Sequence, residues 1–269
     1  MKTIIKKLIP RRIGYVLRSI YLFFRKIIYS GNKFFCPLCR RSYKSFLDGG
    51  FDLAVNKEMQ IIGAGRRKHV VCPGCASTDR DRLLFVYLNS SPGILKPSVK
   101  TLHIAPEPGL GKYLSSMSKT EYVSGMKYHE GFYYGKNTKL FDITALPFEE
   151  NKFELIVCNH VLEHIDDDHQ AMKEIYRVMK PNGTAILQVP WSPILKETRE
   201  DSSVKDPKER EKQFGQFDHV RLYGTDYPDR LKKAGFNVEI VTLEQLNIKV
   251  DYQKRISVIP NEVIFIAKK

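Results

Sequence analysis

The sequence predicts an α/β protein in which helices cover both faces of a mostly parallel sheet, preceded by a small cysteine-rich module and a basic helix. Seven short β-rich runs alternate with helical patterns from about residue 97 onward. Before that point lie two C-x-x-C pairs and an N-terminal stretch, residues 1–47, with twelve Lys or Arg and no Asp or Glu. Alternating strands and helices form sheets whose ligands bind beyond the carboxyl ends of the strands. We therefore expect three parts: residues 1–33, 34–96 and 97–269.

Residues 1–33 predict a basic amphipathic helix. Apolar side chains recur there at helical spacing, at Ile13, Val16, Leu17, Ile20, Phe24, Ile27 and Ile28. Lys and Arg interrupt every apolar run, which argues against a secretory signal and against a membrane span. A helix of this kind favours the surface of an anionic membrane. The alternatives are packing on the protein's own body and contact with RNA.

The two cysteine pairs, "CPLC" and "CPGC", predict a zinc site. Cys36, Cys39, Cys72 and Cys75 have the spacing that lets four thiolates surround Zn²⁺. Four sulfur ligands leave no open position, so the zinc is expected to be structural, within a small zinc-ribbon-like module. Disulfides are the alternative, but the charged N-terminus without a secretory signal indicates the cytoplasm, with peripheral attachment to the inner face of the membrane. Cys158, in an apolar run, is expected to be a core residue.

A short linking helix follows the second pair. Ser77 or Thr78 is expected to cap it, and a Pro-Gly pair ends it. Arg80 and Arg82 lie near its start, where side chains are usually solvated, with contact to an anionic group as the alternative.

Seven runs predict the strands of the sheet: residues 99–105, 121–125, 138–143, 153–159, 183–190, 236–243 and 262–267. Between them, helices are clearest at residues 167–180 and 226–234. The run "HVLEH", His160 to His164, matches the H-x-x-E-H motif of one class of zinc peptidases. That motif needs a long packed helix, whereas here it directly follows a strand, so a peptidase is not favoured. Glu163 and His164 are instead expected to stabilise a strand-to-helix turn.

The stretch "LPFEENKFELIVCNHVLEHIDDDHQAMKEIYRVMKPNGTAILQVP", residues 146–190, resembles class I S-adenosylmethionine-dependent methyltransferases. With "CPxC", "HIAPEP" and "FGQFDHVRLYG", the sequence is similar to a methyltransferase type 11-like bacterial branch with N-terminal zinc knuckles. The resemblance implies a Rossmann-like, doubly wound, seven-stranded methyltransferase sheet over residues 97–269. It implies S-adenosyl-L-methionine as cofactor, bound by His103, Ala105, Glu107, Gly109, Asp142, Ile143, Asn159 and His160.

Particular roles follow from the resemblance. Asp142 would accept a hydrogen bond from the adenine amino group, with Ile143 against the ring, and residues 159 and 160 would line the methionine end. His103 stands where the family has an acid, and Met126 occupies the place of the acid that grips the ribose, a contact for which Glu107 is the substitute.

The segment after the fifth strand, residues 191–224, is expected to face the acceptor. Trp191 begins it, and Asp218, His219 and Arg221 lie together near its end. A hydroxyl acceptor needs a base, and a histidine oriented by a carboxylate suits that task. We therefore expect His219 and Asp218 to be catalytic, and Trp191 and Arg221 to bind substrate, with Arg221 pairing with an anionic group. A structural role for His219 is the alternative.

The leading functional hypothesis is a methyltransferase that acts near a membrane on a glycan or small-molecule acceptor. An RNA methyltransferase is the second hypothesis, although "NHVL" stands where base-methylating enzymes have an aromatic clamp. The third is a non-catalytic scaffold, because the cofactor loop has few glycines.

Overall fold

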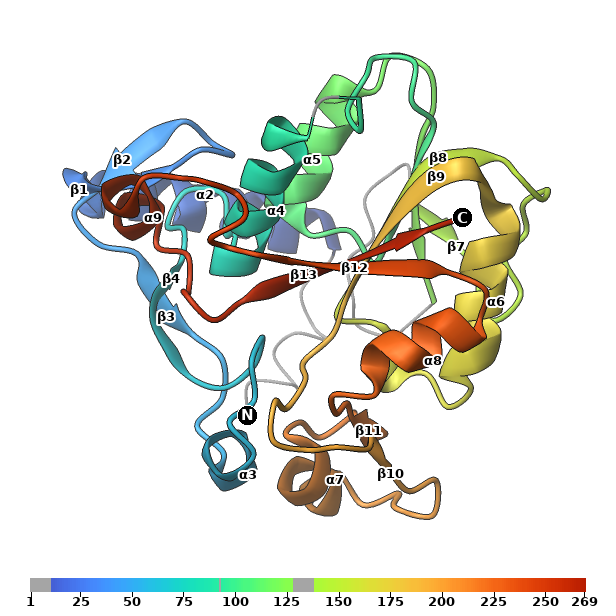
Figure 1. Ribbon diagram of the computed structural model, residues 1–269. Helices are drawn as coiled ribbons and strands as arrows, with labels where there is room; N and C mark the ends of the chain where they lie inside the picture. Colours follow the sequence, from blue (N-terminus) through green and yellow to red (C-terminus); the bar gives the residue numbers. More distant parts are fainter. Residues whose placement is uncertain (1–10, 92, 128–137) are drawn as a thin grey trace.

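A seven-stranded sheet forms the centre of the computed structural model, which describes residues 11–91, 93–127 and 138–269 (Figure 1). Across the sheet the strands are β12 (Asn237–Thr242), β13 (Val263–Lys268), β9 (Met179–Gln188), β8 (Phe153–Asn159), β5 (Thr101–Ile104), β6 (Tyr122–Met126) and β7 (Thr138–Leu140). Every neighbouring pair from β9 to β7 is parallel, whereas β13 runs antiparallel to both of its neighbours. The predicted α/β sheet of seven strands is confirmed.

Helices pack on both faces of this sheet because side chains alternate along its buried strands. Leu155 and Val157 of β8 join one apolar cluster, and Ile156 and Cys158 join the other. The first cluster takes in α4 (Asp79–Ser90), α5 (Pro108–Met117) and α9 (Val250–Ile256). The second takes in α6 (Asp168–Val178) and α8 (Tyr227–Lys233). The expected linking helix, α4, is thus also a core helix of the sheet.

The N-terminal module consists of two small antiparallel hairpins. They comprise β1 (Ser30–Cys36) with β2 (Arg41–Tyr43), and β3 (Leu47–Gly49) with β4 (Arg67–Val71), and a short helix, α3 (Ala54–Glu58), lies between β3 and β4. Its apolar cluster is small and is built from Phe34, Tyr43 and Phe46 around the cysteines. A module with so little core needs a further source of stability.

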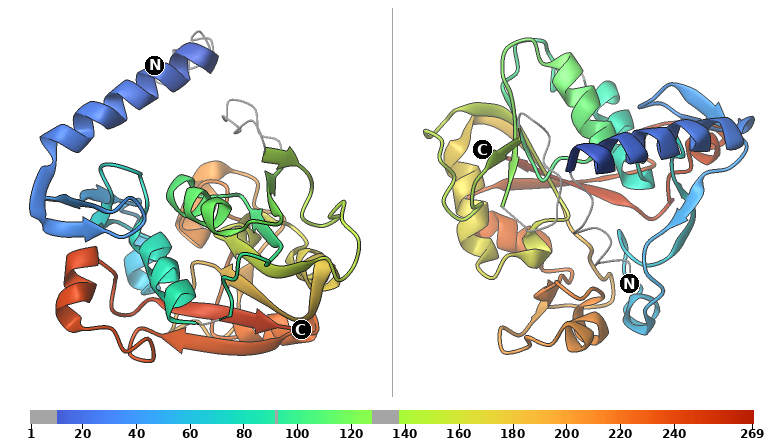
Figure 2. Two further views of the ribbon diagram at one scale, coloured as in Figure 1. Left: turned by 90° about the horizontal axis from the view of Figure 1, so that it is seen from above. Right: turned by 180° about the vertical axis from the view of Figure 1, so that it is seen from behind.

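Helix α2 (Arg11–Ile28) confirms the expected N-terminal helix, apart from its first ten residues, which lie outside the described part of the chain. Figure 2 shows α2 extending away from the body of the protein. Near its carboxyl end, the Arg25 guanidinium donates hydrogen bonds to the carbonyls of Pro73 and Cys72 at 2.7 and 3.4 Å. Its large apolar side chains are about half exposed: Leu17, Ile20, Tyr21, Phe23, Phe24, Ile27 and Ile28. Within the described ranges, no helix has the length and apolar character needed to cross a bilayer.

The segment after β9 folds over the lower edge of the sheet in Figure 1. It contains β10 (Arg199–Glu200), α7 (Pro207–Phe214) and β11 (Arg221–Leu222). Trp191 pairs with Ile62 of the N-terminal module and with Tyr223, so both parts of the chain meet beside this edge.

Candidate active site

The loops that follow β5 and β8 meet at one edge, because these two strands are parallel neighbours. Ala105 and His160, the residues just after the two strands, have φ angles of 50° and 53°. A backbone hydrogen bond holds each of them. The Ala105 N–H donates to the Gly125 carbonyl at 2.8 Å, and the His160 N–H donates to the Gln188 carbonyl at 2.7 Å. Positive φ is uncommon for residues other than glycine and is concentrated at functional sites. Ala105 lies at the first-strand loop, where the cofactor's backbone contact was expected.

Glu107 ties the two loops together. Its Oε2 accepts a hydrogen bond from His103 Nε2 at 2.8 Å, and its Oε1 accepts one from Asn159 Nδ2 at 2.9 Å. The Tyr122 hydroxyl donates to His103 Nδ1 at 2.9 Å. Burial opposes ionisation, yet the hydrogen bonds from His103 and Asn159 hold the pKa of Glu107 below its usual value. His103 is fully buried, so it positions Glu107 instead of contacting the cofactor as expected.

Asp142 follows the carboxyl end of β7, and its side chain is 39% exposed. Its Oδ1 accepts hydrogen bonds from the backbone and hydroxyl of Thr144, at 2.9 and 2.7 Å, and its Oδ2 pairs with Lys127 at 2.9 Å. The Thr144 hydrogen bonds, followed by Lys127, lower the pKa of Asp142 to about 2. The carboxylate is therefore ionised and can accept a further hydrogen bond. Ile143 is 4% exposed and belongs to the apolar core, so little of it is available to an adenine ring.

The "HVLEH" run forms a turn, as expected: β8 ends at Asn159 and a 3-10 helix, η1 (Leu162–His164), precedes α6. Arg80 donates to His160 Nδ1 at 3.1 Å, and His160 Nδ1 lies 3.5 Å from Glu163 Oε1. Burial, followed by the charge of Arg80, lowers the pKa of His160 to about 4, so this imidazole is neutral near pH 7. Burial opposes ionisation of Glu163, but the neighbouring imidazoles of His160 and His164 lower its pKa to about 2.

His219 is brought next to this turn. Its ring and that of His164 lie 4.7 Å apart at 85°. His219 Nδ1 donates to the Phe214 carbonyl at 3.1 Å, whereas Asp218 Oδ2 lies 3.4 Å from His164 Nδ1. The expectation that Asp218 orients His219 is therefore corrected: Asp218 faces His164. Burial lowers the pKa of His219, which favours the neutral imidazole.

Arg221 also differs from its expected role. It is 3% exposed, and its guanidinium donates to the Leu162 and Asp166 carbonyls at 2.9 and 2.8 Å and to Glu200 Oε2 at 2.9 Å. With the Ile165 carbonyl as a further acceptor, four of its five N–H donors are used within the protein, and the guanidinium is buried away from an anionic acceptor. Arg221 instead fastens the "HVLEH" turn to the segment after β9.

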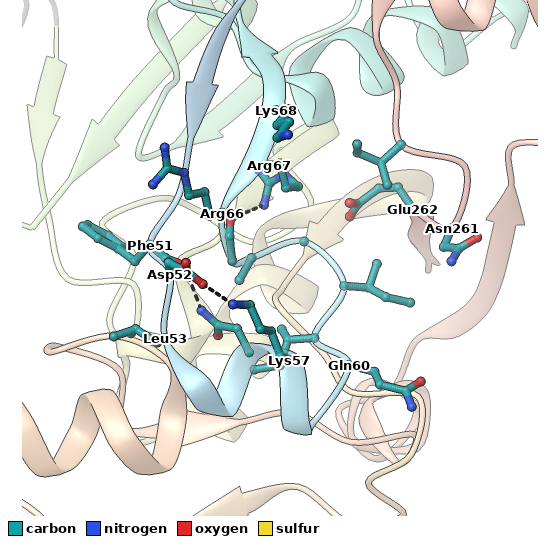
Figure 3. A pocket seen from close by; sticks show the side chains of 17 residues that line it. Phe51, Asp52, Leu53, Lys57, Gln60, Arg66, Arg67, Lys68, Asn261 and Glu262 are labelled. Atoms are coloured by element: carbon teal, nitrogen blue, oxygen red, sulfur yellow. Dashed lines mark hydrogen bonds and ion pairs between the residues drawn. The ribbon is translucent and has the colours of Figure 1, made fainter.

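A cavity of about 520 Å³ lies between the N-terminal module and the segment before β13 (Figure 3). Arg66, Arg67 and Lys68 of the module line one side, and Glu262 lines another. Gly63 separates the cavity from the strand ends, since a Cβ atom there would lie 3.3 Å from His160 Cε1. Burial raises the pKa of Glu262 to about 7. The cavity thus borders the candidate site from the side of the cysteine module.

Trp191 lies between the module and the segment after β9. Its backbone exchanges two hydrogen bonds with Ile62, at 2.9 and 3.1 Å, and Ile62 lines the cavity. The indole Nε1 is buried and, among the described residues, has no hydrogen-bond partner. This position keeps Trp191 as a candidate contact for the acceptor.

The four paired cysteines converge as their spacing predicted. Cys36 and Cys75 have sulfur atoms 3.6 Å apart, and Cys39 and Cys72 have sulfur atoms 3.7 Å apart. All four sulfurs lie within 4.8 Å of one another. Hydrogen bonds from the other three thiols lower the pKa of Cys36, so the first negative charge of the cluster is favourable. Four thiolates at these distances fit a tetrahedral metal ion.

Gly109 lies against this cluster and not at the cofactor edge. A Cβ atom at Gly109 would come within 2.9 Å of Ser77 Cβ and 3.6 Å of Cys75 Sγ. The first turn of α5 therefore packs directly on the cysteine module, and this contact explains the glycine.

Sequence reasoning missed the parts that Arg80 and Glu163 play at the site. Arg80 was expected to be solvated, yet it contacts both Gly63 and His160. A carboxylate in a mostly apolar turn was a signal that Glu163 has a role at the site. Its proximity to His219 could not be read from the sequence, because His219 belongs to a distant segment.

The strand order, with antiparallel β13 between β9 and β12, defines the fold as that of a class I methyltransferase. Residues 111–187 match the family described as "Methyltransferase domain". The chain therefore contains a class I S-adenosylmethionine-dependent methyltransferase domain.

Curated relatives of this domain carry names of more than one activity. Mitochondrial arginine-hydroxylase NDUFAF5 of Danio rerio is 30% identical over 124 residues, 42% of this chain and 38% of that protein. The ubiquinone/menaquinone biosynthesis C-methyltransferase UbiE of Desulfotalea psychrophila is 35% identical over 52 residues, 19% of this chain and 21% of that protein. Each match thus spans well under half of the relative's length. The solved structure of YcgJ from Bacillus subtilis aligns with a TM-score of 0.45 at 15% identity, over 68% of this chain and 97% of that one.

Proposed function

We propose that the protein transfers a methyl group from S-adenosyl-L-methionine to a hydroxyl of a glycan or small molecule at a membrane surface. The main support is a set of buried polar atoms at the end of β8. Asn159 Oδ1, His160 Nε2 and Glu163 Oε2 have no hydrogen-bond partner within the described ranges. Buried polar atoms are nearly always hydrogen-bonded, so atoms like these indicate the place of a ligand.

The residues at this edge fit the cofactor. The strained Ala105 lets the first loop turn sharply at the strand end, and Asp142 offers an ionised, partly exposed carboxylate. When bound, S-adenosyl-L-methionine supplies a methyl group on a positively charged sulfur. The acceptor oxygen would bond to the methyl carbon as the carbon–sulfur bond breaks with its electron pair left on sulfur, and water or a basic group beside the acceptor would take the hydroxyl proton. Alignment of the two reactants would supply most of the acceleration.

The anionic group of the acceptor would lie in the cavity beside Gly63. Gly63 packs against His160, and Arg66 and Lys68 at the cavity favour an acceptor that carries a phosphate or carboxylate. This cavity replaces Arg221, whose donors are used within the protein, as the proposed site for the anionic group.

The cofactor assignment predicts a loss of affinity in Asp142→Ala. We expect S-adenosyl-L-methionine to bind about 1–3 kcal/mol more weakly, which is the cost of losing a hydrogen bond to a charged group. Isothermal titration calorimetry measures the change. Asp229→Ala is the matched control, because Asp229 also pairs with a lysine, at 2.9 Å, but lies on α8. Equal affinity in the wild type and Asp142→Ala would refute the role of Asp142, and no binding in any form would favour the scaffold hypothesis.

The four-cysteine cluster would hold one structural Zn²⁺. Its fully sulfur ligand set suits zinc, and the small core of the module explains why the ion is needed.

Helix α2 would bind an anionic membrane on the cytoplasmic side. The seven apolar side chains between Leu17 and Ile28 named above are exposed, and Arg25 and Lys26 add positive charge in the last turn. RNA is the competing partner, and its binding would fall steeply with salt.

This attachment predicts that Ile20→Glu combined with Phe24→Glu releases the protein from vesicles. Burying a large apolar side chain contributes about 1.5–3 kcal/mol, so the double substitution should weaken partition by at least about tenfold. Cosedimentation with vesicles of phosphatidylserine and phosphatidylcholine measures it, with pure phosphatidylcholine vesicles as the neutral comparison. Ile240→Glu, at an exposed isoleucine of β12, should leave partition unchanged. Unchanged partition in the double variant would exclude α2 as the anchor.

The name of the zebrafish relative favours hydroxylation of an arginine as a second candidate activity. An assay that follows methyl label from S-adenosyl-L-methionine into product separates the two, because hydroxylation leaves the label on the cofactor.

A further inference from the structure

Three side chains outside the cysteine module form a second cluster of metal-ligating groups. They are Glu163 and His164 of η1 and His219 of the segment after β9, and their ligand atoms all lie within 4.8 Å of one another. The distance from Glu163 Oε1 to His164 Nε2 is 4.0 Å. Ligands that lie about 2.0–2.2 Å from a shared metal ion are separated by about 3.0–4.2 Å, so this spacing suits a common ion.

One oxygen of the carboxylate in this cluster lacks a hydrogen-bond partner among the described residues. Glu163 is 1% exposed, and its Oε2 has no hydrogen-bond partner in the described part of the chain. A buried carboxylate oxygen without a partner is costly, and a cation is one of the few ligands that satisfies it.

Both imidazoles are held in the orientation that metal ligands adopt. His219 Nδ1 donates to the Phe214 carbonyl at 3.1 Å, and His164 Nδ1 lies 3.3 Å from the Asp218 carbonyl and 3.4 Å from its carboxylate. With Nδ1 bonded outward in each ring, the lone pair is left on Nε2. Metal-binding histidines almost always have such an outer carbonyl or carboxylate partner.

We propose that Glu163, His164 and His219 bind a divalent cation whose remaining positions take oxygen atoms of the acceptor. One oxygen and two nitrogen ligands suit Zn²⁺, Mn²⁺ or Fe²⁺, and three protein ligands leave positions open. Sugars carry neighbouring hydroxyls that fill two such positions together. The cation site rests on the side chains alone, whereas its use for an acceptor rests on the proposed methyl transfer. In this arrangement His219 acts as a ligand and not as the base expected from the sequence.

The test uses the full chain carrying one equivalent of zinc, so that the thiolates are filled, and Mn²⁺ as the probe. Thiolates prefer zinc, whereas carboxylate and imidazole accept Mn²⁺. Electron paramagnetic resonance of free Mn²⁺ should show one ion bound per chain. Loss of an outer partner of a metal ligand already costs about 10- to 100-fold in affinity. Loss of a ligand itself, in Glu163→Gln or in His219→Ala, should therefore weaken Mn²⁺ binding by at least that factor.

Two controls separate loss of the site from loss of the fold. His169→Ala, at a histidine on α6 outside the cluster, should bind Mn²⁺ as the wild type does. His164→Ala alters a ligand that is 28% exposed and gives a second variant if one of the buried positions fails to fold. Each variant must keep its zinc and its circular dichroism spectrum.

The proposal is overturned if wild-type protein leaves all Mn²⁺ free, because the cluster is then a hydrogen-bonded group only. It is also overturned if His219→Ala binds Mn²⁺ as tightly as wild type. The Mn²⁺ assay contains no S-adenosyl-L-methionine, so it tests the cation site independently of methyl transfer. If Mn²⁺ binds while calorimetry shows no S-adenosyl-L-methionine binding, the cation site stands and the proposed methyl transfer fails.

Discussion

A Cys72→Ser chain is expected to lose its zinc and to unfold at a much lower temperature than the wild type. Cys72 is fully buried in the module's small core, and its sulfur lies 3.7 Å from that of Cys39. Zinc binding contributes about 10–16 kcal/mol in isolated zinc-finger peptides, whereas a typical substitution costs about 0.5–3 kcal/mol. Losing even part of the zinc contribution should therefore exceed the effect of most single substitutions.

Elemental analysis of reduced protein and thermal unfolding followed by circular dichroism measure the two effects. Cys158→Ala is the control, because Cys158 is also buried but belongs to the core of the sheet, and this variant should keep its zinc. Wild-type protein that contains no zinc, or a Cys72→Ser chain that melts like the wild type, would contradict the structural role of the ion.

Arg82→Met should destabilise the protein by about 3–5 kcal/mol, because several buried carbonyls lose their donor at a cost of about 1–3 kcal/mol each. Arg82 is fully buried, and its guanidinium donates to the carbonyls of Ser77, Val70 and Ser257 at 3.0, 2.9 and 3.1 Å and to that of Ile256. Methionine fills much of the volume but leaves all four carbonyls without this donor. Because these carbonyls come from the module and from the end of α9, the loss affects the junction between them.

Urea unfolding measures the free energy change. Lys254→Met is the control, since Lys254 is an exposed cation of α9 and its replacement should change the free energy of unfolding by no more than about 0.5 kcal/mol. If Arg82→Met were as stable as this control, the four carbonyls would have to be satisfied in another way.

The sheet was predictable from the sequence because its strands are read locally. "FELIVCN" is apolar almost throughout since β8 is buried on both faces, and the acidic run after "HVLEH" supplies the cap of α6, where Asp167 accepts a hydrogen bond from the Gln170 backbone at 2.9 Å. The cysteine cluster was predictable for a similar reason, since each pair carries its spacing within four residues. Thr78 was correctly expected as a cap of α4.

What could not be predicted depends on contacts between distant segments. Arg82 lies near a helix start, where arginines are usually solvated, and its burial is favourable because carbonyls of the module and of the end of α9 surround its guanidinium. Gly109 fits a cofactor loop by position, yet its neighbour is Ser77 of another part of the chain. The pairing of Asp218 with His164, and not with the adjacent His219, likewise depends on how the segment after β9 folds onto the turn.

The contact of Gly109 with Ser77 and Cys75 has a thermodynamic consequence. The helix that starts at the cofactor loop rests on the four-cysteine cluster, so the cysteine module and the loop share one packing surface. If loss of the metal alters this surface and weakens cofactor binding, the cofactor must strengthen metal retention by the same factor, because coupling between two binding equilibria is reciprocal. The zinc would then act as an allosteric effector of the methyl donor, and oxidation of the thiolates would weaken cofactor binding.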